Sequence, residues 1–195
     1  KRTKVIAAAN GGDVDAMLLL HEAYSLGNNY LGFEFNGAEY VRWAKKASDA
    51  GSAIGTCLLA HHYELGYGME GKWKKPNRML AMHLYTRSAM DGCAKACYVL
   101  GERFAKGWKA DKMTLVDRDY DAAALWLRKA ADLHASTPEP EVDVADVQLY
   151  DDDSTWMNEW LAWNEERKGP PPVHEDDLDE EDELEDDDEE EELEE

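Results

Sequence analysis

Apolar and polar residues alternate along the first two thirds of this chain with the period of amphipathic helices, and the pattern repeats. In each repeat a small residue is followed eight positions later by an aromatic residue and three positions after that by glycine. The three copies are Ala16, Tyr24 and Gly27; Gly55, Tyr63 and Gly66; and Ala96, Phe104 and Gly107. A fixed period of about 40 residues predicts helical repeats that stack into a solenoid.

A second pattern follows each copy of the first. Trp43, Leu84 and Trp126 recur at intervals of 41 and 42 residues, and glycine follows the first two after eight positions, at Gly51 and Gly92. The two patterns together predict a pair of antiparallel helices in each repeat, with glycine ending the helices. The expected helices span about residues 13–27, 38–50, 52–65, 76–91, 94–106 and 118–133.

The repeat pattern stops after His134. The polar and acidic segment 135–153 is interpreted as a linker, after which Ser154 or Thr155 is expected to cap another helix. The sequence therefore predicts repeats at about 5–51, 52–92 and 93–134, the linker, a tryptophan-rich helix at 154–168 and an acidic tail at 169–195.

The helix after the linker carries Trp156, Trp160 and Trp163 on one face, because their spacings are four and three residues. Two interpretations stay open for this stripe. It covers the exposed end of the solenoid, as terminal repeats require. Alternatively, it is a free amphipathic helix that docks into the groove of a partner.

The net charge of −22 is divided unequally along the chain. Residues 1–134 carry a net charge of +4, whereas residues 135–195 carry −26. In the segment 174–195, 18 of 22 residues are Asp or Glu, so we expect this tail to be disordered in isolation. A charge division of this kind indicates an interaction tail.

The paired patterns resemble the Sel-one-like repeat (SLR), a relative of the tetratricopeptide repeat. The match is clearest in the third repeat, through Phe104 and Gly107 followed by Trp126, Lys129 and Ala130. The resemblance covers about residues 5–134 and implies an all-α, right-handed helical-repeat solenoid. It also implies a non-enzymatic scaffold, adaptor or assembly factor that binds a protein or peptide partner, because members of this family are rarely enzymes.

The repeated aromatic residues are expected to form the core, since large rings at helix crossings bury the most area. They are Tyr24, Trp43, Tyr63, Tyr85, Phe104 and Trp126. The polar residues beside the first aromatic of each repeat are candidates for a partner-binding concave face, or are ordinary solvated positions. These candidates are Glu22, His61, His62, Glu102 and Arg103.

Two loops combine lysine with tryptophan. The loop of the second repeat holds Lys72, Trp73, Lys74 and Lys75, and that of the third holds Trp108 and Lys109. Equivalent loops of a solenoid lie side by side, so we expect these two to be neighbours. Such loops suit a phosphate with a stacked base or, equally, an acidic peptide; the alternative interpretation is that they carry ordinary solvated charges. The acidic tail argues against nucleic acid, because it would compete for the same lysines.

The acidic tail leads to two further hypotheses. First, it binds the basic loops of its own chain, because opposite charges attract within a Debye length. Second, as an alternative function, it makes the protein a polyanionic, chaperone-like factor that shields a basic protein client.

The remaining chemistry is sparse. Cys57, Cys93 and Cys97 form no regular disulfide framework, which favours a reducing intracellular compartment and buried thiols over a metal site. No nucleophile elbow, phosphate-binding glycine loop or metalloprotease motif is present. We therefore expect no catalytic residues, no cofactor and no metal. No apolar run approaches the length that spans a bilayer.

Overall fold

The computed structural model describes residues 1–26, 32–67, 75–110, 113–136 and 151–166. The chain forms two compact units, Lys1–Tyr150 and Asp151–Glu195. The helices of the first unit are α1 (Arg2–Asn10), α2 (Val14–Leu26), α3 (Gly37–Asp49), α4 (Ala53–Leu65), α5 (Arg78–Met90), α6 (Ala94–Lys106) and α7 (Tyr120–Ser136).

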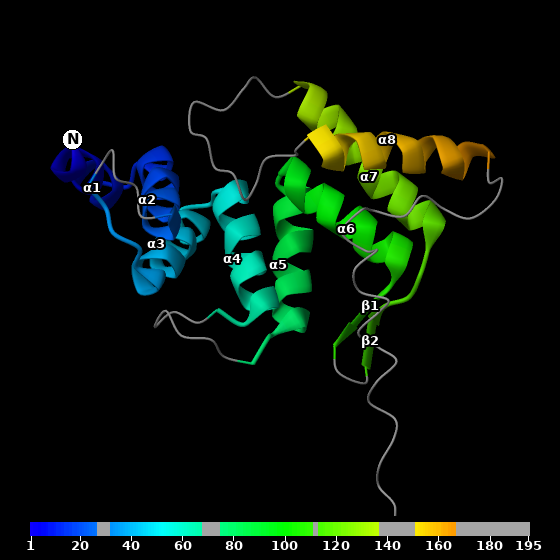
Figure 1. The fold of residues 1–195 in the computed structure, drawn as a ribbon, viewed down its shortest axis with the longest axis horizontal. Coiled ribbons are helices and arrows are strands. Elements are labelled where there is room, and N and C mark those ends of the chain that lie inside the picture. Colours follow the sequence, from blue (N-terminus) through cyan, green and yellow to red (C-terminus); the bar gives the residue numbers. More distant parts are fainter. Residues whose placement is uncertain (27–31, 68–74, 111–112, 137–150, 167–195) are drawn as a thin grey trace, which may run out of the picture. The chain divides into compact units, whose positions relative to one another are not determined.

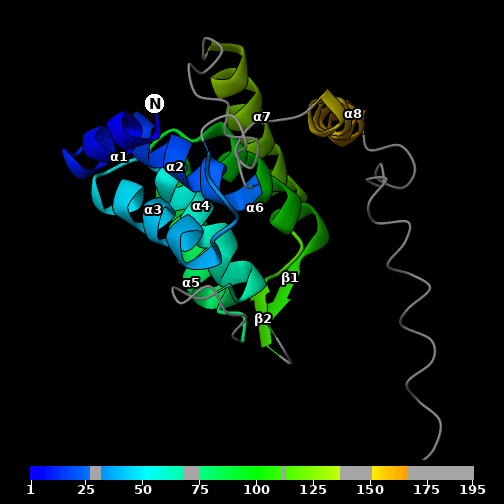
Figure 2. The same ribbon diagram turned by 60° about the vertical axis from the view of Figure 1, so that its left-hand side comes forward.

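Each helix of the first unit packs against the next one along the chain (Figure 1). Helices α2 and α3, α4 and α5, and α6 and α7 form the three predicted pairs, and Figure 2 shows the same sequence of neighbours from a second side. The helical-repeat fold class is therefore confirmed.

Helix α1 was not predicted, yet the turn that follows it has the form of the turns between repeats. Gly12, Gly51 and Gly92 have φ angles of 97°, 88° and 94°, a conformation that glycine adopts without strain. After each glycine, the next amide donates to the carbonyl five positions earlier, as from Ser52 to Ala47 at 3.0 Å. Helix α1 is therefore structurally equivalent to α3 and α5.

A backbone hydrogen bond closes the connection within each pair of helices. The residue that caps the second helix donates its amide to the carbonyl of the repeat's first aromatic residue. The three bonds are Asn36 to Tyr24 (3.1 Å), Asn77 to Tyr63 (2.8 Å) and Asp119 to Phe104 (2.8 Å). The side chains of these capping residues also accept from amides of the first helical turn, which satisfies otherwise unpaired donors. We call this backbone bond the loop clamp.

The small residues of the repeat lie where helices cross closely. Ala16, Gly55 and Ala96 are all buried. A Cβ atom added to Gly55 would lie 2.5 Å from the Cβ of Ala47 and 2.7 Å from the backbone nitrogen of Ser48. Helices α3 and α4 therefore approach so closely that a methyl group does not fit between them.

The repeated aromatic residues contribute to the core to different degrees. Trp43 and Tyr85 are buried, with 1% and 2% of their surface exposed, whereas the other four predicted core aromatics are half-buried. Phe33, which the repeat pattern did not single out, is 1% exposed and packs its ring edge-on to Tyr24, with ring centroids 4.8 Å apart. Much of the remaining core consists of alanine and leucine from the facing helices.

The loop expected at 107–117 contains a β-hairpin. Strands β1 (Trp108–Ala110) and β2 (Met113–Val116) pair antiparallel, with Trp108 opposite Val116 and an irregularity in register after Trp108. Trp108 and Val116 are 8% and 5% exposed, so the hairpin is anchored by an apolar pair at its base. This correction to the predicted loop follows from the preference of aromatic and β-branched residues for strands.

The second unit contains helix α8 (Asp151–Glu166). The predicted caps Ser154 and Thr155 are wrong, because both residues lie inside this helix. The rings of Trp160 and Trp163 lie 5.7 Å apart. The side chain of Trp156, residues 137–150 of the expected linker and the expected acidic tail are outside the described residues.

Replacing Gly55 by alanine tests the close crossing of α3 and α4. Because backbone atoms of α3 block the new methyl group, Gly55→Ala should lower the free energy of unfolding by about 1–3 kcal/mol. Urea denaturation measures this change. Met90→Ala, at a residue that is 72% exposed, is the control and should stay within about 0.5 kcal/mol of the wild type. An unchanged stability of Gly55→Ala would contradict the crossing.

Candidate interaction surface

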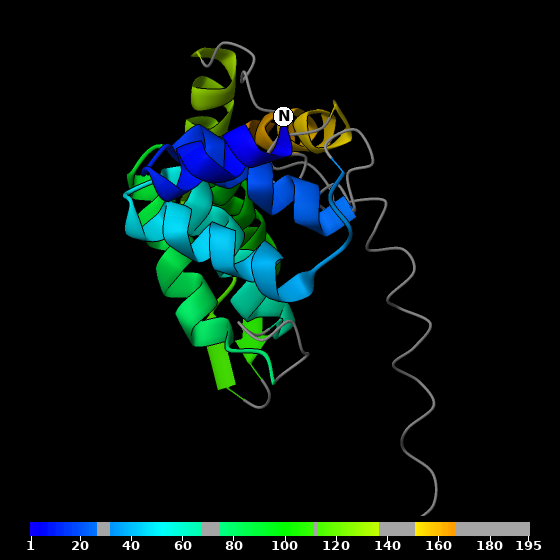
Figure 3. The same cartoon turned by 90° about the vertical axis from the view of Figure 1, so that its left-hand side faces the viewer.

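The start of α5 in the second repeat and the hairpin of the third repeat meet at one edge of the first unit. The guanidinium of Arg78, at the start of α5, donates from Nη1 to the carbonyl oxygen of Lys109 on β1 at 2.8 Å. The hairpin therefore lies beside the end of the preceding connection, on the side where α4 ends and α5 begins (Figure 3). We call this region the loop edge and define it by Leu65, Lys75, Arg78, Met79 and the two strands Trp108–Ala110 and Met113–Val116.

A polar network behind the loop edge links two repeats. The carboxylate of Glu64 on α4 accepts from Nη2 of Arg103 on α6 at 2.9 Å and from the hydroxyl of Tyr85 on α5 at 2.8 Å. Nη1 of Arg103 also lies 3.7 Å from Oε2 of Glu102. The network thus joins three successive helices through one carboxylate.

The network holds a fixed positive charge. Burial disfavours the charged form of Arg103, but the carboxylates of Glu102 and Glu64 outweigh it and raise the pKa of the guanidinium. Burial, followed by the charge of Glu64, raises the pKa of Tyr85 well above its usual value. The guanidinium also lies over the ring of Trp108, 5.3 Å from its centroid, in a cation–π contact. Arg103 therefore connects the network to the hairpin.

Apolar side chains are exposed on the loop edge among the cations. Leu65, Met79 and Met113 are 45%, 61% and 50% exposed. Lys75 and Lys109 are also exposed. A surface that combines long, flexible apolar side chains with lysines and an arginine suits a segment of opposite charge that carries apolar residues of its own.

Comparison with solved structures decides the fold family. A Sel1 repeat protein from Oxalobacter formigenes has a TM-score of 0.53 and 29% identity over 70% of this chain and 90% of its own. A protective antigen of uropathogenic Escherichia coli strains, which displays an SLR fold, has a TM-score of 0.53 and 22% identity over 86% of this chain. The chain spans 34% of that antigen. No protein-family model and no curated protein matches.

This chain has the Sel-one-like repeat fold. The resemblance found in the sequence is thereby confirmed, and the SLR pairs are α2 with α3, α4 with α5, and α6 with α7. The loop edge is accordingly the side of an SLR array where the two helices of a pair are connected.

The candidate residues of the first helices in this SLR array have different environments. Glu22 and His61 are half-buried on α2 and α4. Glu102 and Arg103 belong to the polar network, so their first role is to join repeats. Of the candidate loop residues, Lys75 and Lys109 lie on the loop edge, whereas residues 72–74 are outside the described part of the chain.

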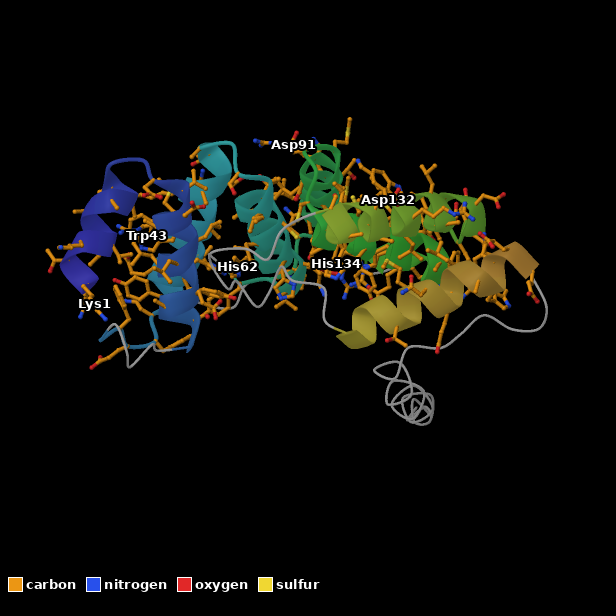
Figure 4. The ribbon with its side chains drawn as sticks, turned by 90° about the horizontal axis from the view of Figure 1, so that it is seen from above. Lys1, Trp43, His62, Asp91, Asp132 and His134 are labelled. Carbon is orange, nitrogen blue, oxygen red and sulfur yellow. The ribbon has the colours of Figure 1, made fainter. Side chains whose placement is uncertain are left out.

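His62 was expected on an exposed binding face, but the structure places it in the interior. It is 2% exposed and lies among packed helices of the SLR array (Figure 4). Its ring packs edge-on to Tyr40, with centroids 4.4 Å apart, and 5.4 Å from the ring of His21. The repeat pattern could have indicated that His62 is buried. His62 aligns with Ala23 of the first repeat, and alanine is typical of a helix crossing.

The environment predicted for Trp108 was also wrong. It was expected in a solvated loop where it could stack on a base, but it is 8% exposed and covered by Arg103.

Among the described residues, no three His, Cys, Asp or Glu side chains come together as metal ligands. None of the described helices has the length and apolarity needed to cross a membrane.

A double-mutant cycle on Glu64 and Arg103 tests the link between these two SLRs. Their side chains are only 12% and 26% exposed, so Glu64→Gln and Arg103→Met should show a coupling energy of about 1–3 kcal/mol in urea denaturation. The exposed pair Lys45 and Asp49 is the control and should show less than about 0.5 kcal/mol. Equal coupling in the two pairs would contradict a stabilising role for the network.

Proposed function

We propose that this protein is a non-enzymatic interaction scaffold whose loop edge binds an acidic, partly apolar segment of a partner protein. The observation that carries the proposal is the hydrogen bond from Arg78 to the carbonyl of Lys109, which places the start of α5 beside the hairpin of the next repeat. The SLR fold supports the general role, because arrays of helical repeats present extended binding surfaces.

The charge and apolarity of the loop edge support an acidic peptide as its ligand. Lys75 and Lys109 are exposed, and the backbone that carries them is fixed by the loop clamps and by Arg78. A fixed surface binds with a smaller entropy cost than one that orders on binding. Met79 and Met113 add exposed apolar surface that adapts to different partner side chains.

A nucleic acid suits the same surface less well. Single-stranded ligands bind proteins through aromatic platforms on which bases stack. Trp108 is buried under Arg103, so its ring is not accessible to a base. A tethered tail with 18 acidic residues in 174–195 would also compete with phosphates for these lysines.

The composition of the tail supports a second candidate function. A segment in which 18 of 22 residues are acidic is suited to a basic client such as a nucleic-acid-binding protein. In that case the tail binds the client and the repeats carry the tail. The two functions differ in which part of the chain the partner needs, and the binding experiment below separates them.

A labelled synthetic peptide of residues 174–195 serves as an acidic probe for the loop edge. It should bind the truncated chain 1–173, and charge reversal in Lys75→Glu/Lys109→Glu should weaken the binding at least tenfold at low salt. Fluorescence anisotropy measures this. The control Lys4→Glu/Arg42→Glu makes the same charge change at exposed residues of α1 and α3 and should weaken binding less than threefold.

Equal losses in the two variants would show general charge attraction and would contradict a site on the loop edge. The client hypothesis is tested with full-length chain and the 1–173 truncation, each mixed with a lysine-rich peptide. Binding that requires the tail and is unaffected by the loop-edge substitutions would favour the chaperone-like function.

The tail should also occupy the loop edge of its own chain. Tethering raises its effective concentration, so removing residues 174–195 should shift the backbone amide signals of Lys75, Arg78 and Lys109 at low salt. The measurement is a comparison of amide spectra of the full chain and the 1–173 truncation. Amides of α1 are the internal reference. Shifts that are absent, or equally large in α1, would contradict binding in cis.

A further inference from the structure

Two exposed methionines lie where the second and third repeats are held together at the loop edge. Met79 follows Arg78 on α5, and Met113 is the first residue of β2, where it pairs with Ala110. The guanidinium of Arg78 donates to the carbonyl oxygen of Lys109, the residue before Ala110. This hydrogen bond therefore places the two methionines on the same part of the loop edge.

The thioethers of these two residues are open to solvent. Met79 and Met113 are 61% and 50% exposed, whereas Met17 in the core is 6% exposed. A dissolved oxidant reaches exposed sulfur far more readily than sulfur in a packed interior. We therefore expect peroxide to modify Met79 and Met113 and to spare Met17.

The fold does not require an apolar side chain at position 79. The equivalent positions of the first and third repeats, two residues after the cap of the second helix, hold Ala38 and Asp121. Core packing therefore does not explain Met79, and its side chain is available for contact with a ligand.

The acidic tail shows what a ligand of this surface would contain. Of the 22 residues in 174–195, 18 are acidic, and the other four are His174, Leu178, Leu184 and Leu193. Such a segment offers carboxylates to the lysines of the loop edge and leucine side chains to the two methionines, whose flexible thioethers adapt to apolar partners. Both kinds of contact would contribute to binding.

We propose that Met79 and Met113 form an oxidation site at which hydrogen peroxide weakens the binding of an acidic, leucine-bearing segment to the loop edge. This inference rests on the proposed function. The sulfur of each methionine attacks one oxygen of a peroxide, the O–O bond breaks, and the departing hydroxide takes the proton of the transferred oxygen. Each sulfur loses two electrons and becomes a sulfoxide, and each peroxide is reduced to one water.

The sulfoxide changes the surface without changing its lysines. The new oxygen accepts hydrogen bonds from water, so covering it with a leucine side chain costs those hydrogen bonds. It also places partial negative charge where a carboxylate-rich ligand binds. The attraction between carboxylates and lysines remains, whereas the apolar part of the contact is lost.

Peptide mapping of the full chain locates the modification. Trypsin places Met113 in 113–118, Met90 in 88–95 and Met17 in 5–42, whereas Met79 shares 79–87 with Met82 and is assigned from fragment masses. After millimolar peroxide, Met79, Met113 and the exposed Met90 should each gain one oxygen, and Met17 should gain none. Dithiothreitol then reverses disulfides but leaves the sulfoxides. A map without oxygen on Met79 and Met113 would overturn the proposal.

Binding of the labelled 174–195 peptide measures the consequence. The truncated chain 1–173, which contains the whole first unit, is treated with peroxide and then dithiothreitol. Oxidation should weaken binding about fivefold, and methionine sulfoxide reductases should restore it. Met79→Leu/Met113→Leu should lose less than about twofold, because leucine keeps the apolar surface and has no thioether. Met90→Leu is the matched control: Met90 is 72% exposed at the other end of α5, so this variant should show the full loss.

A second peptide, in which serine replaces the three leucines, separates apolar from charge contacts. It should bind the reduced chain more weakly, and oxidation should change its binding less than about twofold. No binding of the original peptide to the reduced chain would overturn the proposed function together with this inference. Three outcomes would overturn the inference alone: binding that oxidation leaves unchanged, a Met79→Leu/Met113→Leu variant as sensitive as the wild type, or an oxidised chain that circular dichroism shows to be unfolded.

Discussion

The loop clamp is the interaction on which the arrangement of the first unit depends. It pairs the carbonyl of one aromatic residue with the amide of the residue that caps the next helix, 12, 14 and 15 positions further on. The clamp thus brings the start of the second helix beside the end of the first helix in each pair, although the three loops differ in length. Added loop residues cost little closure entropy. The helices can stack regularly while the connections differ. The loops at this edge can therefore differ from one repeat to the next without disturbing the core.

Much of the fold was predictable because the period of the small and aromatic residues reflects packing. Gly55 recurs where Ala16 and Ala96 recur, since each lies at a close helix crossing. Helix α1 was missed because its residues include no aromatic marker. The hairpin was missed because its two strands are short and because the contact of Trp108 with Arg103 joins the loop to a helix that is distant from β2 in the pattern of repeats.

The candidate site was less predictable, because it depends on contacts between repeats. The sequence predicted that the basic connections are neighbours, but it could not show that Arg78 binds the backbone at Lys109. The same holds for Glu64 and Arg103, which are 39 positions apart. His62 was misplaced for a related reason: its polarity suggested exposure, whereas the residue is 2% exposed and its ring packs edge-on against Tyr40. In each case a tertiary contact determined the role of the residue, and the sequence around that residue did not indicate the contact.

The polar network has a consequence for how the chain opens. In most repeat arrays each element contacts its immediate neighbours, so an array can fray from its ends one helix at a time. Glu64 and Arg103 connect α4 to α6 across α5, and Tyr85 of α5 shares the same carboxylate. Helix α5 is thereby enclosed by its neighbours. Amide hydrogens of α4, α5 and α6 should accordingly exchange with solvent as one cooperative foldon, slower than those of α1.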